Sequence, residues 1–559
     1  MSLMETLARA EAVAGGRAVP AATVRHRYLA AEPLVFVPLT TAGEAGAPLG
    51  ALIGTRREDP TLLVVPQPLD RDLRFAFFAG LADAALPRIE EYTREVEIEP
   101  ATRNREESEV CADAVQIVVP NSAALEYVRL LGRSTRFLRT VEDSDAPHPV
   151  PVPVPLLGRW LTHYAERART PGSALLVAMT ELLTRHWATG QSSMEDQHLG
   201  ALLAWIAPPP GSDGATAAES AQTDRGKDGL LLSPPAGPAT DPVFDNAALA
   251  PAMARYDAAR AATGPDAARA VAAAEEEVRR LVASQLLPTW DDVWRGLDLL
   301  RALPEAAHVA DRWKRDRWSF TGHRDRLAAG EPPQPKRDGA IAAAQKLAGR
   351  ETAQARLAAQ EALDDPLTMA ARRLAGEAVA GEITAVEMAY SDGKRPMPRP
   401  LLTLLTDDRP QAEPGTKAYR AVPGARSAQS AELVSVEAAD TASVGGAAKA
   451  ADAGAAGAAD AVGAADAADA GAWEMSGPAT GGRARVVVRL TGGMGSGRVP
   501  KEGSVPGPGD RVVFTFFEHD PRGGPGLPEP QDTPWTHGGP PDAAAPPERP
   551  DPVTAEDYL

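Results

Sequence analysis

The apolar residues in the first third of the chain fall into short runs that are followed by helical stripes. Residues 34–39 (Leu-Val-Phe-Val-Pro-Leu), 61–65 and 114–119 are apolar runs of strand length. Asn121 follows the third run and can cap a helix, because its side chain accepts hydrogen bonds from the first free backbone N–H groups. Strands that alternate with helices are typical of an α/β layer with parallel strands. We therefore predict an α/β domain over residues 28–146.

The middle of the chain changes to helical spacing. After a proline-rich segment, residues 156–206 place apolar side chains three to four positions apart, which predicts a small helical module. Residues 207–244 are rich in Pro, Gly, Ser, Thr and Asp, a composition typical of a disordered linker. Residues 245–380 are alanine-rich, and alanine has the highest helix propensity, so we predict a helical region there.

The last third changes to a period of two. Residues 483–490 and 511–517 are clear strands, and four or five such short strands can close a small β-barrel over residues 381–519. Residues 423–482 interrupt this domain with a tract of almost only Ala, Gly and Asp, which predicts a disordered insertion, and residues 520–559 form a Pro/Gly-rich acidic tail that we also expect to be disordered. The predicted fold class is multidomain α+β: an N-terminal α/β domain, a central helical region and a C-terminal small β-barrel-like domain with a disordered insertion.

The composition of the chain limits the binding partners and the cellular compartment that we expect for it. Its 559 residues carry a net charge of −18, which disfavours nucleic acid and anionic membranes on average, so any nucleic-acid contact needs a local basic patch. Arginine greatly outnumbers lysine, which together with the alanine excess indicates a GC-rich genome. The single cysteine, Cys111, excludes an internal disulfide and a Cys-rich metal site. We find neither a secretory signal nor an apolar stretch of membrane-spanning length, and we expect a cytoplasmic protein without a membrane partner.

Motifs for known chemistries are not assembled in the sequence. No lysine completes a phosphate-binding G-x-x-x-x-G-K pattern, and no two histidines have the His-x-x-x-His spacing of a helical zinc site. Cys111 has no histidine near it in sequence to act as a base, so we expect an inert buried thiol. The glycine-rich residues 491–497 do not open into a helix, as a dinucleotide-binding loop must. We therefore expect no catalytic, cofactor-binding or metal-binding residues, and no cofactor.

Residues 312–350 are the one stretch in which basic side chains alternate with aromatic ones. Arginines beside aromatic rings can follow a nucleic-acid backbone and stack on its bases. The alternative is that the tryptophans anchor a helical core while Arg and Asp pair on its solvent side. The candidate nucleic-acid-binding residues are Arg312, Trp313, Lys314, Arg315, Arg317, Trp318, Arg324 and Arg326.

Three functional hypotheses follow from these patterns. The first is a non-catalytic cytoplasmic accessory or adaptor protein, a scaffold that binds a protein partner through its helical and β-rich modules. The second is a nucleic-acid-associated protein that uses residues 312–350 together with the β-barrel. The third is a hydrolase or transferase in the N-terminal α/β domain, which requires Cys111 or the carboxylates of residues 90–113 to converge in a pocket.

Overall fold

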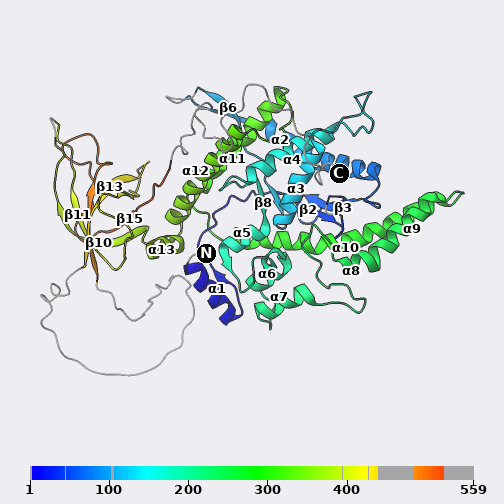
Figure 1. The fold of residues 1–559 in the computed structure, drawn as a ribbon, viewed down its shortest axis with the longest axis horizontal. Coiled ribbons are helices and arrows are strands. Elements are labelled where there is room, and N and C mark those ends of the chain that lie inside the picture. The colour runs from blue at the N-terminus through cyan, green and yellow to red at the C-terminus, as the bar shows by residue number, and fades with distance from the viewer. Residues whose placement is uncertain are drawn as a thin grey trace, which may run out of the picture. The chain divides into compact units, whose positions relative to one another are not determined.

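A computed structural model describes residues 3–44, 46–101, 106–392, 395–425, 427–438 and 483–521. The chain divides into two compact units, Met1–Thr368 with Pro521–Leu559, and Met369–Asp520 (Figure 1). Most of the predicted insertion, residues 439–482, and nearly all of the predicted tail, residues 522–559, lie outside the described residues.

The first unit is built on a five-stranded mixed sheet of order β4-β3-β2-β7-β8. Strands β2, β3 and β4 form an antiparallel meander, whereas β7 and β8 run parallel to β2. Every residue of β2 is buried, which explains why this strand is an uninterrupted apolar run and not an alternating one. The predicted mixture of strands and helices is confirmed. The strands are β2 (Leu34–Thr40), β3 (Pro48–Gly54), β4 (Thr61–Val64), β7 (Ile117–Val119) and β8 (Leu176–Ala178).

Helices α3 (Ser122–Thr135) and α4 (Pro153–Ala168) follow β7 and pack closely on each other. The side chain of Asn121 accepts a hydrogen bond from the backbone N of Ala124, so the predicted cap is present. A Cβ atom on Gly158 would lie 2.5 Å from the backbone N of Arg136. The absence of a side chain at that position therefore allows the two helices to approach at this point.

One hydrophobic core joins segments that we predicted as separate modules. It runs from Ala12 to Phe320 and includes the sheet, α4 and the long helix α10 (Ala267–Arg301). Strand β8 comes from the predicted helical module, yet it forms an edge of the sheet. The remaining elements of this unit are α1 (Leu3–Gly15), β1 (Val19–Pro20), α2 (Arg71–Arg94), β5 (Val96–Glu99), β6 (Ser108–Cys111), α5 (Met179–His186), β9 (Trp187–Ala188), η1 (Glu195–Gln197), α6 (Leu199–Ile206), α7 (Gly214–Thr223), α8 (Pro242–Phe244), η2 (Asp245–Leu249), α9 (Ala250–Ala261), α11 (Val309–Ala328) and α12 (Ala340–Asp364).

The expectation of a disordered linker over residues 207–244 is corrected by the structure. Helix α7 forms inside it, and the side chain of Asp213 caps this helix by accepting from the backbone N of Thr216. Further along, the side chain of Asn121 donates to the carbonyl oxygen of Gly237 at 2.8 Å. The segment has few large apolar residues, but its small ones, such as Ala218 and Ala236, are buried against the unit. Its order therefore comes from tertiary contacts that composition does not reveal.

The second unit contains a closed six-stranded barrel of order β10-β11-β14-β13-β12-β15, which confirms the predicted barrel. In β14, Ala484, Val486, Val488 and Leu490 are buried and alternate with more exposed residues, as a filled barrel requires. Helix α13 (Pro366–Leu374) spans the boundary between the units. None of the described helices is long and apolar enough to cross a membrane. The strands are β10 (Ala378–Glu387), β11 (Leu401–Thr406), β12 (Lys417–Arg420), β13 (Gln429–Ala438), β14 (Ala484–Leu490) and β15 (Arg511–Thr515).

Candidate functional site

Helix α11 carries all eight candidate nucleic-acid-binding residues, and three of its basic side chains pair with the acidic β5–β6 hairpin. Arg317 donates to the carbonyl oxygen of Cys111 at 3.0 Å and also pairs with Glu97. Lys314 Nζ lies 2.9 Å from Glu99 Oε1, and the indole N–H of Trp318 donates to the same oxygen at 3.0 Å. These groups are therefore engaged inside the protein. At the end of the helix, Arg324 pairs with Asp325 and Glu109, whereas Arg326 is exposed.

Arg312 and Trp313, two of the candidate nucleic-acid-binding residues, are buried. The Trp313 ring stacks on Tyr28 with ring centroids 4.0 Å apart, and its indole N–H donates to Asp113 Oδ1 at 2.7 Å. These contacts favour the alternative in which the tryptophans anchor a helical core. Base stacking on Trp313 would require the protein to give up the Tyr28 contact.

The groups required by the hydrolase or transferase hypothesis do not converge. Cys111 is fully buried, and its backbone N–H donates to Thr321 Oγ1 at 3.0 Å. Glu97, Glu99 and Glu109 each pair with a different cation of α11. Throughout the described part of the chain, no group of three or more His, Cys, Asp and Glu side chains could hold a metal ion.

A cavity of about 220 Å³ lies between α4, the turn that follows it, α11 and α12. We call it the arginine pocket, because four arginines line it while none of the described residues that line it is Asp or Glu. Such a lining gives the cavity wall a positive side-chain charge that suits an anionic ligand. The lining residues are Arg167, Thr170, Pro171, Gly172, Ser173, Arg312, Arg315, Gly349, Ala353, Arg356, Leu357 and Gln360.

Helical periodicity explains why these residues meet. Arg312 and Arg315 are one turn apart on α11, so they project from the same side of the helix. On α12 the lining residues from Gly349 to Gln360 recur at intervals of one turn, and the small ones leave space for the cavity. Gly172 closes the wall with a φ of +89°, and a Cβ atom at this position would lie 3.1 Å from Arg312 Cδ. Glycine therefore suits both the backbone conformation and the close approach.

Arg312 brings a buried positive charge to this pocket. The residue is 5% exposed, and its Nη1 and Nη2 atoms donate to Gln360 Oε1 and to the carbonyl oxygen of His26, each at 2.9 Å. Both acceptors are neutral, and among the described residues Arg312 forms no ion pair within 4.0 Å. Burial lowers the pKa of Arg312. More distant carboxylates such as Glu361 act to raise this pKa, but burial has the larger effect. A buried charge without an ionic partner is costly, so an anion in the pocket would stabilise it.

The positive charge of Arg167, unlike that of Arg312, is neutralised by a carboxylate. Its Nε atom lies 2.7 Å from Asp316 Oδ1, and Asp316 also accepts from the backbone N of Ala174 at 2.7 Å. Burial raises the pKa of the fully buried Asp316 carboxyl, while Arg167 and these hydrogen bonds oppose that rise. The pair fixes the position of the Arg167 guanidinium at the edge of the pocket.

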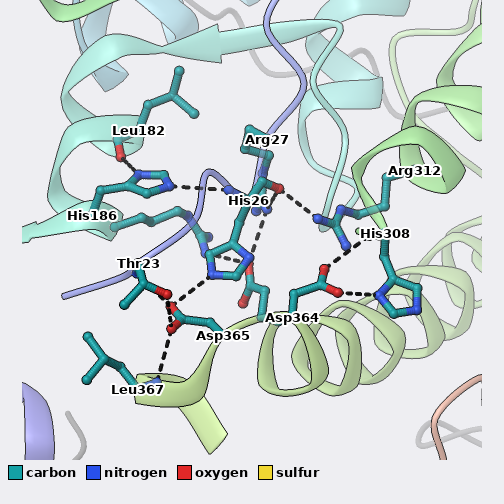
Figure 2. Close-up of polar contacts among 12 residues, drawn as sticks. Thr23, His26, Arg27, Leu182, His186, His308, Arg312, Asp364, Asp365 and Leu367 are labelled. Carbon is teal, nitrogen blue, oxygen red and sulfur yellow. Dashed lines mark hydrogen bonds and ion pairs between the residues drawn. The ribbon is translucent and has the colours of Figure 1, made fainter. Parts of the chain in front are cut away.

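A network of polar groups, several of them buried, lies near Arg312 at the C-terminal end of α12 (Figure 2). Asp365 accepts from the Thr23 hydroxyl at 3.0 Å, and its other oxygen lies 3.4 Å from His26 Nε2. His308 Nδ1 lies 2.6 Å from Asp364 Oδ1. We call these residues, together with Arg27, Arg185, His186 and Glu361, the α12 anchor, because they tie the end of this helix to the N-terminal segment of the chain.

The α12 anchor resembles catalytic chemistry only in its residue types. In a nucleophilic triad the hydroxyl donates to the histidine, whereas here the Thr23 hydroxyl donates to the carboxylate of Asp365. Glu361 lies 3.2 Å from Arg27 and 3.6 Å from Arg185; burial acts to raise the pKa of Glu361, but these two arginines outweigh it and lower the pKa. The geometry is that of an ionic clamp.

The residue pattern of the sequence pointed to Arg312 and Arg315 but missed the rest of the arginine pocket. Arg167 lies on a helix far away along the chain, and nothing in its local sequence marks it as a pocket residue. The available signal was the α12 face on which Arg356 and Gln360 alternate with small residues. The chain has no match among protein-family models, curated proteins or solved structures. Its function must therefore be argued from this geometry.

Proposed function

We propose that this chain is a non-catalytic accessory protein whose arginine pocket binds a small phosphate-bearing ligand. The observation that carries this proposal is the environment of Arg312, a buried guanidinium whose hydrogen-bond partners are neutral and whose neighbours in the pocket include three further arginines. The cytoplasmic adaptor role and its protein partner belong to the same proposal, with ligand binding as the signal that the adaptor carries.

The chemistry of the wall favours phosphate. Guanidinium groups bind phosphate oxygens with paired N–H donors, and a dianion satisfies several of them at once. The volume of about 220 Å³ is below the roughly 300–1,000 Å³ of sites for drug-sized ligands, so a compact phosphate compound fits better than a large cofactor. Leu357, Pro171 and Ala353 add an apolar wall for the body of such a compound.

The same wall argues against catalysis in the pocket. Its lining residues in the described chain include no histidine, cysteine or carboxylate that could act as a general base. Thr170 and Ser173 supply hydroxyl groups, which can donate to a phosphate without transforming it. Binding without turnover is the role that this set of side chains supports.

Isothermal titration calorimetry of the full chain with pyrophosphate tests the proposal. We expect the unmodified chain and Arg326→Gln to bind alike, since Arg326 is an exposed arginine of the same helix outside the pocket. Arg312→Gln and Arg315→Gln should each weaken binding by about tenfold or more, because each removes a guanidinium from the anion. Circular dichroism confirms that each variant is folded.

Two results would overturn this assignment. Equal affinity of Arg312→Gln, Arg315→Gln and the unmodified chain would place the anion elsewhere. Binding of a single-stranded oligonucleotide that Arg326→Gln weakens, without binding of pyrophosphate, would favour the nucleic-acid hypothesis instead.

A further inference from the structure

The helix faces of α4 and α11 that reach the arginine pocket also meet each other beyond it. On α4, His163 precedes the pocket residue Arg167 by one turn, so the two side chains share a face. On α11, His323 follows the pocket residue Arg312 by about three turns. The buried face of α11 carries, at intervals of about one turn, Arg312, Asp316, Phe320 and His323. The contact that shapes the pocket therefore includes a histidine from each helix.

The two histidines stack on each other inside the protein. The ring centroids of His163 and His323 are 4.3 Å apart, and the ring planes differ by only 5°. His163 is 7% exposed and His323 is 1% exposed, and the edge of Trp160 of α4 packs against both rings. Among the described residues, no hydrogen-bond partner meets His163 Nε2 or either ring nitrogen of His323. A protonated His323 would therefore have no hydrogen-bonded counterion in this arrangement.

The cations around the stack also oppose its protonation. Burial is the largest cause of the lowered pKa of His163, and His323, Arg326 and Arg167 lower it further. Burial lowers the pKa of His323 to about 3, and the charges of Arg326 and Arg159 act in the same direction. The nearby backbone of Arg159 acts to raise the pKa of His323, but burial has the larger effect. Both rings are therefore neutral while α4 and α11 stay in contact.

The other titratable groups at this contact do not supply a counterion for the stack. The Asp316 carboxylate is occupied by Arg167 and by the backbone N of Ala174. Burial raises the pKa of Tyr164, and Tyr92 of α2 adds to this effect, so the phenol of Tyr164 stays neutral. In the segment after α11, the Glu331 carboxylate acts on the pKa of Arg159. Protonation of either histidine therefore requires that the two helices separate and admit water.

We propose that the stacked His163 and His323, which we call the histidine latch, hold α4 and α11 closed around the arginine pocket, and that acid opens the latch and releases the phosphate-bearing ligand. This inference rests on the proposed function of the pocket and adds its regulation. Opening separates Arg167 from Arg312, because these pocket arginines lie on the two helices that move apart. The bound anion then loses part of its cationic wall.

The size of the effect follows from the number of protons. Histidines exposed to water in the open form titrate near pH 6.5. Each one favours the open form by about tenfold for every pH unit below that value, so the two together favour it by up to about 100-fold per pH unit. A form that is rare at neutral pH therefore becomes populated as the pH approaches 4.5.

Hydrogen exchange of the ligand-free full chain tests the opening itself. Between pH 6 and 4.5, the protection factors of α4 and α11 should fall by up to about 100-fold per pH unit, because the open form binds protons that the closed form does not. Exchange in α10, which belongs to the same hydrophobic core, should stay slower than in α4 and α11. Equal protection of all three helices at every pH would show that they open only by global unfolding, and would overturn the latch.

Titration calorimetry with inorganic sulfate tests the release of the ligand, since sulfate remains a dianion throughout this pH range. The affinity of the unmodified chain should fall by about tenfold or more between pH 7 and 4.5. His163→Phe/His323→Phe keeps two stacked rings without titrating groups, so its affinity should change by less than about twofold. The matched control is His198→Asn, which removes another buried histidine while keeping a side chain that can cap α6. It should lose affinity in acid as the unmodified chain does.

The remaining outcomes separate the latch from the proposed function. Circular dichroism checks the fold of the double variant, and the single variant His163→Phe, with one titrating group fewer, should show about half of the logarithmic loss of affinity. An equal loss of affinity in the double variant and the unmodified chain would overturn the latch and leave the pocket as an anion site. The absence of sulfate binding at pH 7 in every form would overturn the proposed function, while hydrogen exchange would still decide whether acid opens the contact.

Discussion

Arg312 and Asp316 stand one turn apart on α11, at the spacing at which Arg and Asp pair on a helix, yet they do not form an ion pair. Asp316 instead binds Arg167 of α4, and Arg312 donates to Gln360 of α12 and to the carbonyl oxygen of His26. The carboxylate that could have neutralised Arg312 is thus used to join two helices. The positive charge of Arg312 remains available to the arginine pocket.

The Arg167–Asp316 pair is expected to stabilise the first unit. Asp316→Asn leaves Arg167 without its carboxylate partner in a buried setting, and breaking such a pair costs about 3 kcal/mol of unfolding free energy. Urea denaturation measures this loss. The control is Asp325→Asn on the same helix, whose exposed pair with Arg324 should contribute less than about 0.5 kcal/mol. Equal effects of the two substitutions would contradict a special role for Asp316.

Buried histidines predict loss of stability in mild acid. Burial lowers the pKa of His186 to about 4 and that of His323 to about 3, and it lowers the pKa of His163, which stacks on His323 with ring centroids 4.3 Å apart. A histidine in the unfolded chain titrates near pH 6.5. Below that pH the unfolded chain therefore binds protons at these histidines, whereas the folded chain leaves them neutral. Stability should therefore be constant with respect to these groups above pH 6.5 and fall as pH decreases towards 4.

The slope of that loss can be measured with one variant. Each histidine that is protonated only in the unfolded chain lowers the unfolding free energy by about 1.4 kcal/mol for every unit that the pH falls between pH 6 and 4. His323→Phe keeps an aromatic ring beside His163 and removes one titrating group, so its slope should be smaller by about that amount. A slope unchanged by His323→Phe would show that His323 accepts a proton in the folded state.

Two helical glycines in different surroundings predict opposite effects of substitution by alanine. Gly158→Ala places a Cβ atom 2.5 Å from the backbone N of Arg136, so it should destabilise the unit by about 1–3 kcal/mol. Gly349→Ala on α12 has no atom within 4 Å of its new Cβ, and higher helix propensity should stabilise it by about 0.5–1 kcal/mol. Thermal unfolding of both variants tests the pair, and destabilisation by Gly349→Ala would contradict the described helix environment.

The α12 anchor predicts local opening when its central carboxylate is removed. Glu361→Gln leaves Arg27 and Arg185 without their shared partner, and a buried unpaired Arg27 should lower the unfolding free energy by about 2–3 kcal/mol. Hydrogen exchange should then accelerate in the last turns of α12 before other helices respond. Glu351→Gln, an exposed position on the same helix, is the control and should leave exchange unchanged.

Much of the local structure followed from short-range pattern. The apolar run at residues 34–39 became the fully buried strand β2, and Asn121 capped α3 as its position before an apolar stripe indicated. The alternation of Ala484, Val486 and Val488 marked the inner face of the barrel. The composition of residues 207–244 predicted a disordered linker, but helix α7 forms there and small residues such as Ala218 are buried. Composition does not show which neighbouring surface such residues pack against.

The sequence alone determined the periodicities, the caps and the acidic net charge, because these depend on residues close together along the chain or on simple sums. Only the tertiary structure decided which residues share a pocket. Arg167, Arg312 and Arg356 come from three helices, and their convergence depends on how α4, α11 and α12 pack. It also decided that Asp316 pairs with Arg167 and not with Arg312. The choice between ionic partners depends on distances across helices and on burial, and neither is encoded in local spacing.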